Sequence, residues 1–567
     1  MQEKNEVHPS AEEVFRDMKI SRRRFLQIGG AGLAGATLLG ATGCDVFGGS
    51  QGGGNGGSGG GGGPITVNLQ DSIRDLDPAI FTDEVSANVS VNIYEGLQRL
   101  DADDLPIPGM AESVDISEDK LTYTFSLRDA KWSNGDSVTS QDFKYGWLRV
   151  LNPDTAAQYA YIVAQFIEGA AEYNSGEGKA EDVAIETPDD KTLEVKLVAP
   201  APFWLGLTSF WTYFPQNQKF VEKQGEKFGQ NADSVLTNGP YTLEEYNPTK
   251  GATFVKSKDY WDADNVSIPK VESKIVKEID TAVNLFESGD LDITEITQEF
   301  VNEYQGKPEF NQATELTCFY MVFNEEAVPI FKNTNVRKAF QIGFDREAMV
   351  KQIINDGSVP ATGLVPAGIA GPDDQTFREA VGDTMPKFDA QEAKRLFDQG
   401  IEEEGGEVPK IELLSYETST ARDIATFLQS QFEENLGIKM SVKIQPFDRK
   451  LELEADGDFQ FSYQGWGADY NDPMTFLDLW LSNSSFNTGS YKNEQFDELI
   501  NQAKKETDFA TRMDQMSEAE KLLIEEDAAC VPMFFQGTTR LIRPSIKNFV
   551  YHRSGGSLDL KLYSVES

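Results

Sequence analysis

Histidine is nearly absent from this sequence of 567 residues, which contains two of them, His8 and His552. His8 lies in a leader segment described below, so the mature chain keeps a single histidine. That scarcity argues against a Ser-His-Asp triad, a Cys-His pair and a zinc site built on histidines. No glycine-rich phosphate loop follows a strand-like run, and no motif singles out a carboxylate pair for glycoside hydrolysis. We expect no catalytic residues, no cofactor and no metal, with a secreted hydrolase as the remote alternative.

Cysteine is also scarce, with three residues at Cys44, Cys318 and Cys530. This number excludes the disulfide framework of a small secreted domain. Cys318 and Cys530 lie in the body of the chain, where they would either form one bond in an oxidising compartment or remain free buried thiols. The sequence leaves both alternatives open.

Basic residues are outnumbered, since 51 Lys and Arg face 93 Asp and Glu and give a formal net charge of -42. A phosphate backbone would be repelled by this charge, so nucleic acid is excluded as a partner. Hydrophobic residues at 39% and charged residues at 25% describe a globular protein long enough for several domains.

The N-terminus carries an export signal. Ser21-Arg22-Arg23-Arg24-Phe25-Leu26-Gln27 matches the twin-arginine pattern, with Arg22 and Arg23 as the paired arginines. The apolar segment that follows, residues 28–42, is rich in Gly and Ala. It is shorter than the roughly 20 residues that a transmembrane helix needs. We therefore expect residues 1–43 to be a signal peptide.

A lipid-attachment site is predicted at the end of this signal. Leu39-Gly40-Ala41-Thr42-Gly43-Cys44 resembles a lipoprotein cleavage box with Cys44 as the first mature residue, although Ala41 replaces the usual Leu. Ordinary cleavage without lipid is the alternative. Residues 44–63 are a Gly-rich tether, whose flexible part has a typical end-to-end distance of roughly 20 to 25 Å. We expect the protein to be anchored to the outer face of the cytoplasmic membrane.

The body of the chain mixes strand-like and helix-like patterns. Residues 411–445 read as strand, helix and strand, the unit that builds parallel sheets. The pattern predicts an α/β fold. The expected elements include strands over 121–127, 411–416, 438–445, 531–535 and 539–542, and helices over 158–175, 421–436 and 494–526.

One stretch has the composition of a binding site. Gly465-Trp466-Gly467-Ala468-Asp469-Tyr470-Asn471-Asp472-Pro473 follows a strand-like run, and it sets a carboxylate beside a large aromatic residue. The glycines allow a ligand to approach the main chain. The alternative is an exposed turn with a structural Trp, because Asp, Asn, Gly and Pro are ordinary turn residues.

Several blocks together carry a family resemblance. They are Asn92-Ile93-Tyr94-Glu95-Gly96-Leu97, Tyr123-Thr124-Phe125-Ser126-Leu127-Arg128, Lys131-Trp132-Ser133-Asn134-Gly135, Thr237-Asn238-Gly239-Pro240-Tyr241, Asn335-Val336-Arg337-Lys338-Ala339-Phe340 with Asp345-Arg346, and the stretch at 465–473. In this order the chain resembles the oligopeptide-binding subfamily of extracellular solute-binding proteins that serve ABC transporters (family 5, peptide/nickel-binding type). The resemblance covers nearly all of residues 65–567.

The resemblance implies an α/β periplasmic-binding-protein clamshell with two lobes and an additional third domain. By this analogy residues 64–94, 216–318 and 538–567 form discontinuous lobe I, and residues 319–537 form lobe II. Residues 95–215 form the extra domain typical of peptide binders. The lobes would close around the ligand by a hinge motion.

The resemblance also implies a set of ligand contacts. Asp469 matches the position whose carboxylate meets the α-ammonium of the ligand. Gly465 and Gly467 would bind the ligand main chain. Other ligand-proximal positions, with core or loop-capping roles as the alternatives, are Tyr159, Trp466, Asn487 and Thr488.

Two residues depart from the family pattern. Tyr463 stands where some relatives carry an Arg that meets the ligand carboxylate, and Gly467 stands where some carry a Cys. Cys318, near the usual partner of that Cys, is therefore not expected to be bonded.

The implied function is capture of oligopeptides by a monomer and their delivery to the permease subunits of an ABC importer. Another solute, such as an oligosaccharide or a nickel complex, is the alternative.

Overall fold

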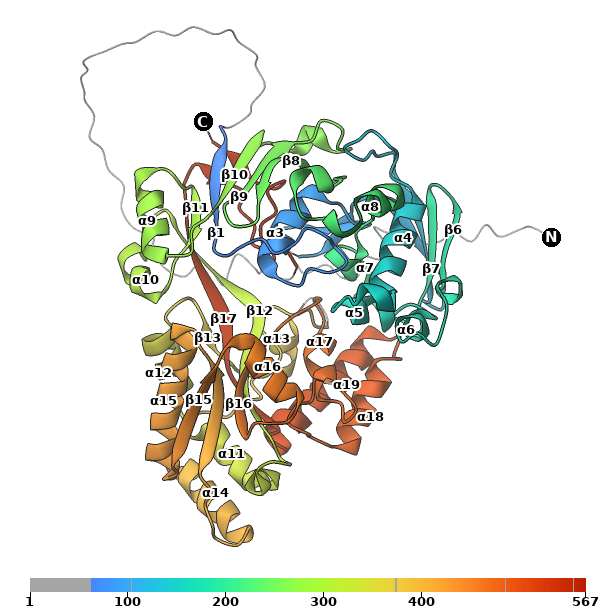
Figure 1. The fold of residues 1–567 in the computed structure, drawn as a ribbon. Coiled ribbons are helices and arrows are strands. Elements are labelled where there is room, and N and C mark those ends of the chain that lie inside the picture. The colour runs from blue at the N-terminus through green and yellow to red at the C-terminus, as the bar shows by residue number, and fades with distance from the viewer. Residues whose placement is uncertain (1–62, 103, 373–374, 485, 554, 567) are drawn as a thin grey trace, which may run out of the picture.

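The computed structural model describes residues 63–102, 104–372, 375–484, 486–553 and 555–566. The predicted signal peptide with Arg22 and Arg23, the predicted lipid-attachment residue Cys44 and the tether up to residue 62 lie outside these residues. Two lobes lie one above the other, and a third domain lies beside the upper lobe (Figure 1).

Two long antiparallel strands, β12 (Phe310–Phe323) and β17 (Cys530–Ile542), connect the lobes (Figure 1). They stand at the centre of an 11-stranded sheet with the order β15-β14-β16-β12-β17-β11-β1-β10-β9-β8, in which β13 also pairs with β17. The lower-lobe strands are β13 (Val359–Pro360), β14 (Ile411–Tyr416), β15 (Met440–Gln445) and β16 (Phe461–Gly467). The upper-lobe strands are β1 (Ile65–Leu69), β8 (Tyr241–Asn247), β9 (Gly251–Lys256), β10 (Lys270–Ile275) and β11 (Ile293–Glu295).

The pairing of β12 with β17 is interrupted between the lobes. Thr314 pairs with Gly537, but the next pair is Cys318 with Phe535, so residues 315–317 face a single residue of β17. Gly537 lies against the main chain of Gly357, where an added Cβ would be 2.0 Å from the Gly357 carbonyl carbon. A bulge of this kind bends a strand pair and breaks its ladder. The break divides the sheet into an upper and a lower part.

The third domain is built on a four-stranded antiparallel sheet with the order β4-β5-β7-β6. Its strands are β4 (Ala111–Ile116), β5 (Thr122–Leu127), β6 (Ile185–Asp189) and β7 (Thr192–Lys196). The strand predicted over 121–127 is confirmed by β5, in which Tyr123, Phe125 and Leu127 are buried on one face. Helix α4 (Ser140–Leu151) begins at Thr139 with a capping box completed by Asp142. The interior is aromatic, with Trp147 and Tyr213 ring centroids 5.0 Å apart.

The predicted strand-helix-strand unit of the lower lobe is confirmed. Strand β14 runs parallel to β15, and α15 (Ser419–Leu436) connects them. The Thr418 hydroxyl accepts from the Ala421 N–H and starts the helix, and Gly437 ends it at a φ of 72°.

Two predicted helices are interrupted. The helix expected over 158–175 is replaced by α5 (Ala160–Ala164) and α6 (Ala170–Asn174), because Gly169 takes a φ of 79° between them. The helix expected over 494–526 is divided into α18 (Glu494–Ala503) and α19 (Phe509–Lys521), with Asp508 capping the second. The strands expected over 531–535 and 539–542 are one strand, β17.

The remaining elements complete the lobes. They are α3 (Glu84–Ile93), β2 (Gln98–Leu100), β3 (Pro106–Pro108), α7 (Trp204–Leu207), α8 (Gln218–Gln224), α9 (Ile279–Ser288), α10 (Gln298–Tyr304), α11 (Thr334–Ile342), α12 (Arg346–Met349), α13 (Phe377–Val381), α14 (Ala390–Glu403), α16 (Phe447–Ala455), α17 (Met474–Leu477), β18 (Ile546–Lys547) and β19 (Ser564–Val565).

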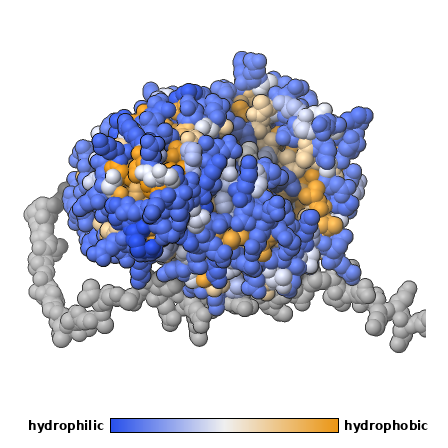
Figure 2. Space-filling model, turned by 90° about the horizontal axis from the view of Figure 1, so that it is seen from below, coloured by the Kyte–Doolittle hydropathy of each residue, from blue (hydrophilic) through white to orange (hydrophobic). Residues whose placement is uncertain are grey.

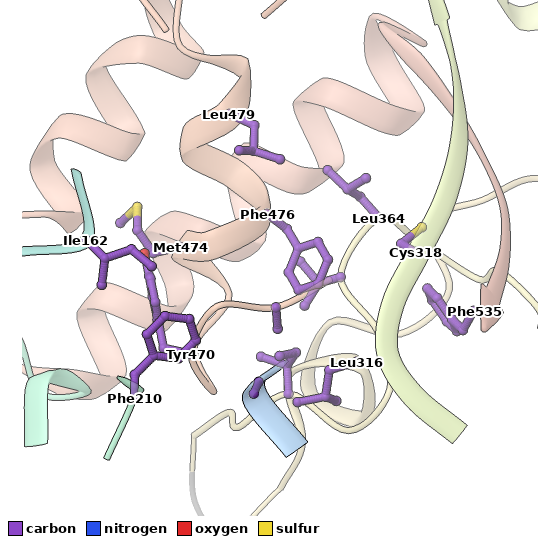
Figure 3. Close-up of a cluster of buried hydrophobic side chains, with 14 of the residues drawn as sticks. Ile162, Phe210, Leu316, Cys318, Leu364, Tyr470, Met474, Phe476, Leu479 and Phe535 are labelled. Atoms are coloured by element: carbon purple, nitrogen blue, oxygen red, sulfur yellow. The ribbon is translucent and has the colours of Figure 1, made fainter. Parts of the chain in front are cut away.

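One buried apolar cluster extends through the third domain and both lobes. Figure 3 shows Ile162 and Phe210 of the third domain beside Tyr470 and Met474 of the lower lobe. The face seen in Figure 2 is mostly hydrophilic with scattered apolar patches, as the excess of charged residues leads one to expect. Within the described ranges, no helix is both long and apolar enough to cross a membrane.

Cys318 and Cys530 are free and buried. In the register of β12 and β17, Cys530 pairs with Val322, four residues beyond Cys318 on the opposite strand. That offset is about 13 Å at about 3.3 Å per residue, whereas a disulfide needs Cα atoms about 4.4 to 6.8 Å apart. Of the two alternatives, the structure therefore agrees with two free buried thiols at Cys318 and Cys530.

Candidate functional site

Strand β16 has an unpaired edge in the lower lobe. On one side it pairs with β12 from Phe461 to Gly467. On the other side, within the described residues, β14 pairs with Phe461 and Ser462 and with no later position of β16. Residues 463–467 therefore present a row of main-chain groups that a further strand can join.

The two glycines of this strand direct their main-chain groups to the free edge. The Ala468 N–H donates to the Leu316 carbonyl on the β12 side at 2.8 Å. Because successive residues of a strand alternate between its two edges, Gly465 and Gly467 point to the opposite side. Both glycines are exposed. At Gly465 the space of a side chain is taken by the Phe319 ring, whose Cε1 would lie 2.5 Å from an added Cβ.

Asp469 stands just beyond the end of β16. Its main-chain N–H donates to Thr475 Oγ1 at 3.2 Å, which fixes the turn. Its carboxylate accepts a hydrogen bond from the Tyr161 hydroxyl of the third domain at 3.2 Å. No ion pair involves Asp469 anywhere in the described part of the chain. The carboxyl is thus held between two domains without a counter-charge.

The electrostatic state of Asp469 follows from this enclosure. Removal from water raises the pKa of its carboxyl to about 7, the Tyr161 hydrogen bond opposes the rise, and the charge of Asp478 adds to it. A cation brought beside the carboxyl would favour the charged form. Among the residues that the structure describes, the carboxyl of Asp469 therefore has no cation beside it to favour the charged form.

Aromatic rings surround this carboxyl. Trp466 contacts Phe486 at a centroid distance of 4.9 Å, and Phe486 contacts Tyr161 at 5.9 Å. Tyr159 stacks on Tyr161 at 5.8 Å and also contacts Trp211 at 5.5 Å. Tyr159 therefore supports the residue that bonds Asp469 and does not itself bond it in this structure.

Asn487 and Thr488 lie in the loop next to β16. The Asn487 side chain donates to the Leu481 and Tyr491 carbonyls at 3.2 and 2.7 Å and accepts from the Tyr491 N–H at 3.1 Å. Thr488 Oγ1 accepts from Gln464 Nε2 at 3.1 Å. These bonds use both amide hydrogens of Asn487 to fix the loop, and they tie the loop to β16 through Thr488.

A cavity of about 1060 Å³ is lined by residues of the third domain, by Asp469 and Tyr470 of the lower lobe and by residues of the C-terminal segment. Phe203, Phe210 and His552 are among the lining residues. The Phe203 ring stacks on Tyr470 with centroids 4.3 Å apart. The apolar contacts next to Asp469 thus hold the third domain against the lower lobe.

A buried charge network lines part of the same cavity. Arg99 pairs with Glu95 at 2.9 Å and with Asp559 at 2.6 Å, and His552 Nδ1 lies 2.9 Å from Asp104 Oδ1. Burial by itself would lower the pKa of His552, but the hydrogen bond with Asp104 and the negative charges of Asp104 and Asp559 raise it to about 9. The imidazole is therefore charged at neutral pH, and the network links β2 to the C-terminal segment.

Four of the predicted site residues come together on β16 and its turn: Gly465, Trp466, Gly467 and Asp469. Of the other three, Tyr159 contacts Tyr161, and Asn487 and Thr488 lie in the loop next to β16. Sequence reasoning did not identify Tyr161, Phe486 or the network around Arg99 and His552. The sequence signal available for Tyr161 was its position two residues after Tyr159. That signal did not distinguish it from the other aromatic residues of the segment. The described residues contain no group of three or more His, Cys, Asp and Glu side chains arranged to hold a metal ion.

Two lobes linked by a strand pair, with an open strand edge and an uncompensated carboxyl between the domains, define a solute-binding protein of the clamshell type. The model of bacterial extracellular solute-binding proteins, family 5, matches residues 106–488. The chain belongs to this family.

Individual relatives are similar over most of their length. The dipeptide-binding protein DppE of Bacillus subtilis is 37% identical over 497 residues, which is 87% of this chain and 90% of the relative. The periplasmic oligopeptide-binding protein OppA of Escherichia coli is 33% identical over 491 residues, 85% of this chain and 89% of the relative.

A solved structure agrees with this result. Listeria monocytogenes OppA bound to peptide superposes with a TM-score of 0.76 and is 33% identical, covering 89% of this chain and 99% of that one. The mixed α/β clamshell with a third domain, expected from the sequence, is confirmed.

Proposed function

We propose that this protein captures oligopeptides outside the cytoplasm and delivers them to the permease subunits of an ABC importer, without chemistry on the ligand. The observation that carries the proposal is the Asp469 carboxyl, which lies at the end of a free strand edge and has no ion pair in the described residues. A peptide has both complementary features, a main chain that can extend a sheet and a terminal ammonium.

The ligand would lie as an added strand along β16. Its ammonium would meet Asp469, and its main chain would bond Gly465 and Gly467. Binding of this kind depends little on the side chains of the ligand, because the main-chain groups are common to all peptides. The proposal is supported by the DppE and OppA relatives, whose names describe dipeptide and oligopeptide binding.

Closure would bring the two halves of the site together. We propose lobe I as residues 64–94, 216–318 and 538–567, the extra domain as 95–215 and lobe II as 319–537. The bulge in β12 near residues 315–317 supports these limits, because it falls at the junction of lobes I and II. Ligand contacts made by Asp469 and Tyr161 from opposite sides would favour the closed form.

Export and anchoring belong to the same proposal. Arg22 and Arg23 would direct export, and Cys44 would carry the lipid that holds the protein, as a monomer, on the outer face of the membrane. Metabolic labelling with a fatty acid tests this: Cys44→Ser should abolish the label and release the protein, whereas Cys530→Ser should not.

Calorimetry of the mature protein with a free peptide and its N-acetylated form tests the ligand. Acetylation should weaken binding by about 2 to 5 kcal/mol, and Asp469→Asn should produce a similar loss for the free peptide alone. Asp383→Asn, at an exposed position, is the matched control. Equal affinity for free and acetylated peptides would contradict the role of Asp469.

Native mass spectrometry of the purified protein tests the class of solute. A ladder of co-purified peptides is the expected result. A co-purified sugar or metal complex in place of peptides would support the alternative and overturn the proposal.

A further inference from the structure

The free edge of β16 ends at a fork between two strands. Strand β14 pairs with β16 at Phe461 and Ser462, and then diverges to end at Tyr416. The ring of Tyr416 stacks on Tyr463 with centroids 5.5 Å apart and planes 5° apart. A ligand strand that starts at Asp469 and follows this edge therefore meets β14 at Tyr463.

The length of the free edge sets how far a ligand can stay in the sheet. From Gly467 to Tyr463 the strand advances four residues, about 13 Å at about 3.3 Å per residue. A peptide longer than about four residues cannot continue straight, because β14 occupies the next position at that edge. Its remaining residues must leave the sheet beside Tyr416.

Aromatic side chains line this point of departure. Phe319 contacts Tyr463 at 5.5 Å, and Tyr416 contacts Phe447 at 5.6 Å, so the rings continue from β12 across the fork to α16. Both basic side chains of α16 are paired. Lys450, 5.8 Å from the Tyr416 ring centroid, is buried and pairs with Glu454 at 2.6 Å, and the exposed Arg449 pairs with Glu452 at 2.7 Å, so neither charge is left unpaired for a ligand carboxylate.

Helix α16 extends the apolar surface outward. Its inner side, with Lys450, Leu453 and Glu454, is buried in the lower lobe. Its outer side exposes Phe447 by 53% and Leu451 by 46%. These two residues are one helical turn apart on the same face. Figure 1 places α16 at the end of the lower lobe nearest the upper lobe. Phe447, through its contact with Tyr416, makes this exposed apolar pair continuous with the fork.

We propose that Tyr416, Phe447 and Leu451, with the buried ring of Tyr463 supporting Tyr416, form an exit track for the C-terminal part of bound peptides. The track binds the ligand residues that follow approximately the fourth and favours apolar side chains at those positions. Its described residues offer no unpaired cation to bind the terminal carboxylate of the ligand. This inference rests on the proposed peptide-binding function and specifies its substrate class as peptides longer than four residues with apolar C-terminal halves.

The test uses calorimetry with the full mature protein and three peptides that share their first four residues. One is the tetrapeptide, one adds leucine and phenylalanine, and one adds two serines. The apolar hexapeptide should bind about tenfold more tightly than the serine hexapeptide, from burial of its two side chains. Amidation of its C-terminus should leave the affinity unchanged.

The test variant and its control both replace exposed apolar residues with serine. In the double variant Phe447→Ser, Leu451→Ser the ratio between the two hexapeptides should fall to near one, while the tetrapeptide affinity stays unchanged. Val408→Ser, which removes an apolar side chain exposed by 46% before β14, should preserve the ratio. Far-ultraviolet circular dichroism checks that each variant is folded.

Each contrary result has a distinct meaning. Equal binding of the two hexapeptides by the unmodified protein, or a loss on amidation, overturns the exit track. The same holds if the double variant keeps the ratio. If none of the three peptides binds the unmodified protein, the proposed function itself fails, whereas binding of the tetrapeptide without a difference between the hexapeptides contradicts the exit track alone.

Discussion

The Tyr161 hydroxyl lies 3.2 Å from Oδ2 of Asp469 and joins the third domain to the lower lobe at the predicted site. The two residues come from α5 and from the turn after β16, which are remote in sequence. Separation of these domains would break the bond and return Asp469 to water, where its carboxyl ionises more readily. The ionisation of Asp469 is therefore coupled to closure.

Replacing Asp469 by Asn should stabilise the unliganded protein at alkaline pH. Its pKa of about 7 in the folded chain exceeds the unfolded value of about 3.9, so folding is penalised increasingly as pH rises between these values. Asp469→Asn should raise the free energy of unfolding by roughly 2 to 4 kcal/mol at pH 8, with the difference vanishing near pH 4. Urea denaturation at pH 4.5, 6 and 8 measures it. A variant equally destabilised at every pH would contradict the explanation.

Peptide affinity should depend on pH through the same group. Below about pH 7 the carboxyl of unliganded Asp469 carries a proton, which must be lost when the ammonium of the ligand binds. The dissociation constant should therefore increase as the pH falls below 7, by up to about tenfold for each pH unit. Titration of a free-amine peptide between pH 5 and 8 tests this. An N-acetylated peptide should show no such slope, and a slope shared by both would point to another group.

Tyr161→Phe should weaken binding and shift its pH dependence. The hydrogen bond from Tyr161 lowers the pKa of Asp469, so its loss should move the midpoint upward and reduce affinity about three- to tenfold. Tyr159→Phe keeps the ring contacts with Tyr161 and Trp211 and serves as the control. Identical behaviour of the two variants would show that the hydroxyl of Tyr161 has no special role.

Protein stability should fall above neutral pH because of His552. The folded-state pKa of about 9 exceeds the unfolded value of about 6.5, so the stabilisation is complete below pH 6.5 and is lost as pH rises through 9. The free energy of unfolding should decrease by roughly 3 kcal/mol between pH 6.5 and 9.5. His552→Gln should flatten this change. Since His552 is the one histidine after residue 8, no other imidazole obscures the measurement.

Phe203→Ala should favour the open form. The stack between Phe203 and Tyr470 holds the third domain against the lower lobe, and an aromatic pair contributes about 0.5 to 1.5 kcal/mol. Small-angle scattering of the unliganded variant should give a larger radius of gyration, and peptide affinity should fall accordingly. Phe388→Ala, at a surface position exposed by 40%, should change neither. A lower affinity with unchanged scattering would assign Phe203 to ligand contact instead.

The sequence predicted the parts of this molecule that depend on local patterns. In the unit formed by β14, α15 and β15, the strands have strand-like residue patterns, Thr418 caps the helix and Gly437 ends it. All of these signals lie within one short stretch of the sequence. The long helices expected over 158–175 and 494–526 were wrong. Their apolar periodicity continues through a break that Gly169 and Asp508 impose by conformation and capping.

Residues of the candidate site could be proposed from the sequence only where they are close together in the chain. Gly465, Gly467 and Asp469 lie within five positions, so their spacing could be interpreted. Tyr161 and Asp469 are 308 positions apart, and Arg99 and Asp559 are 460 apart. Such contacts are chosen by the packing of whole domains, and no local pattern distinguishes Tyr161 from Tyr159.

The interruption of the β12 and β17 ladder has a mechanical consequence. Because two strands cross from lobe to lobe side by side, any relative motion must satisfy both crossings at once, which suppresses twisting and sliding. We expect the remaining motion to be mainly a hinge rotation at the bulge near Gly537. One relative movement of the lobes would then be enough to enclose a peptide.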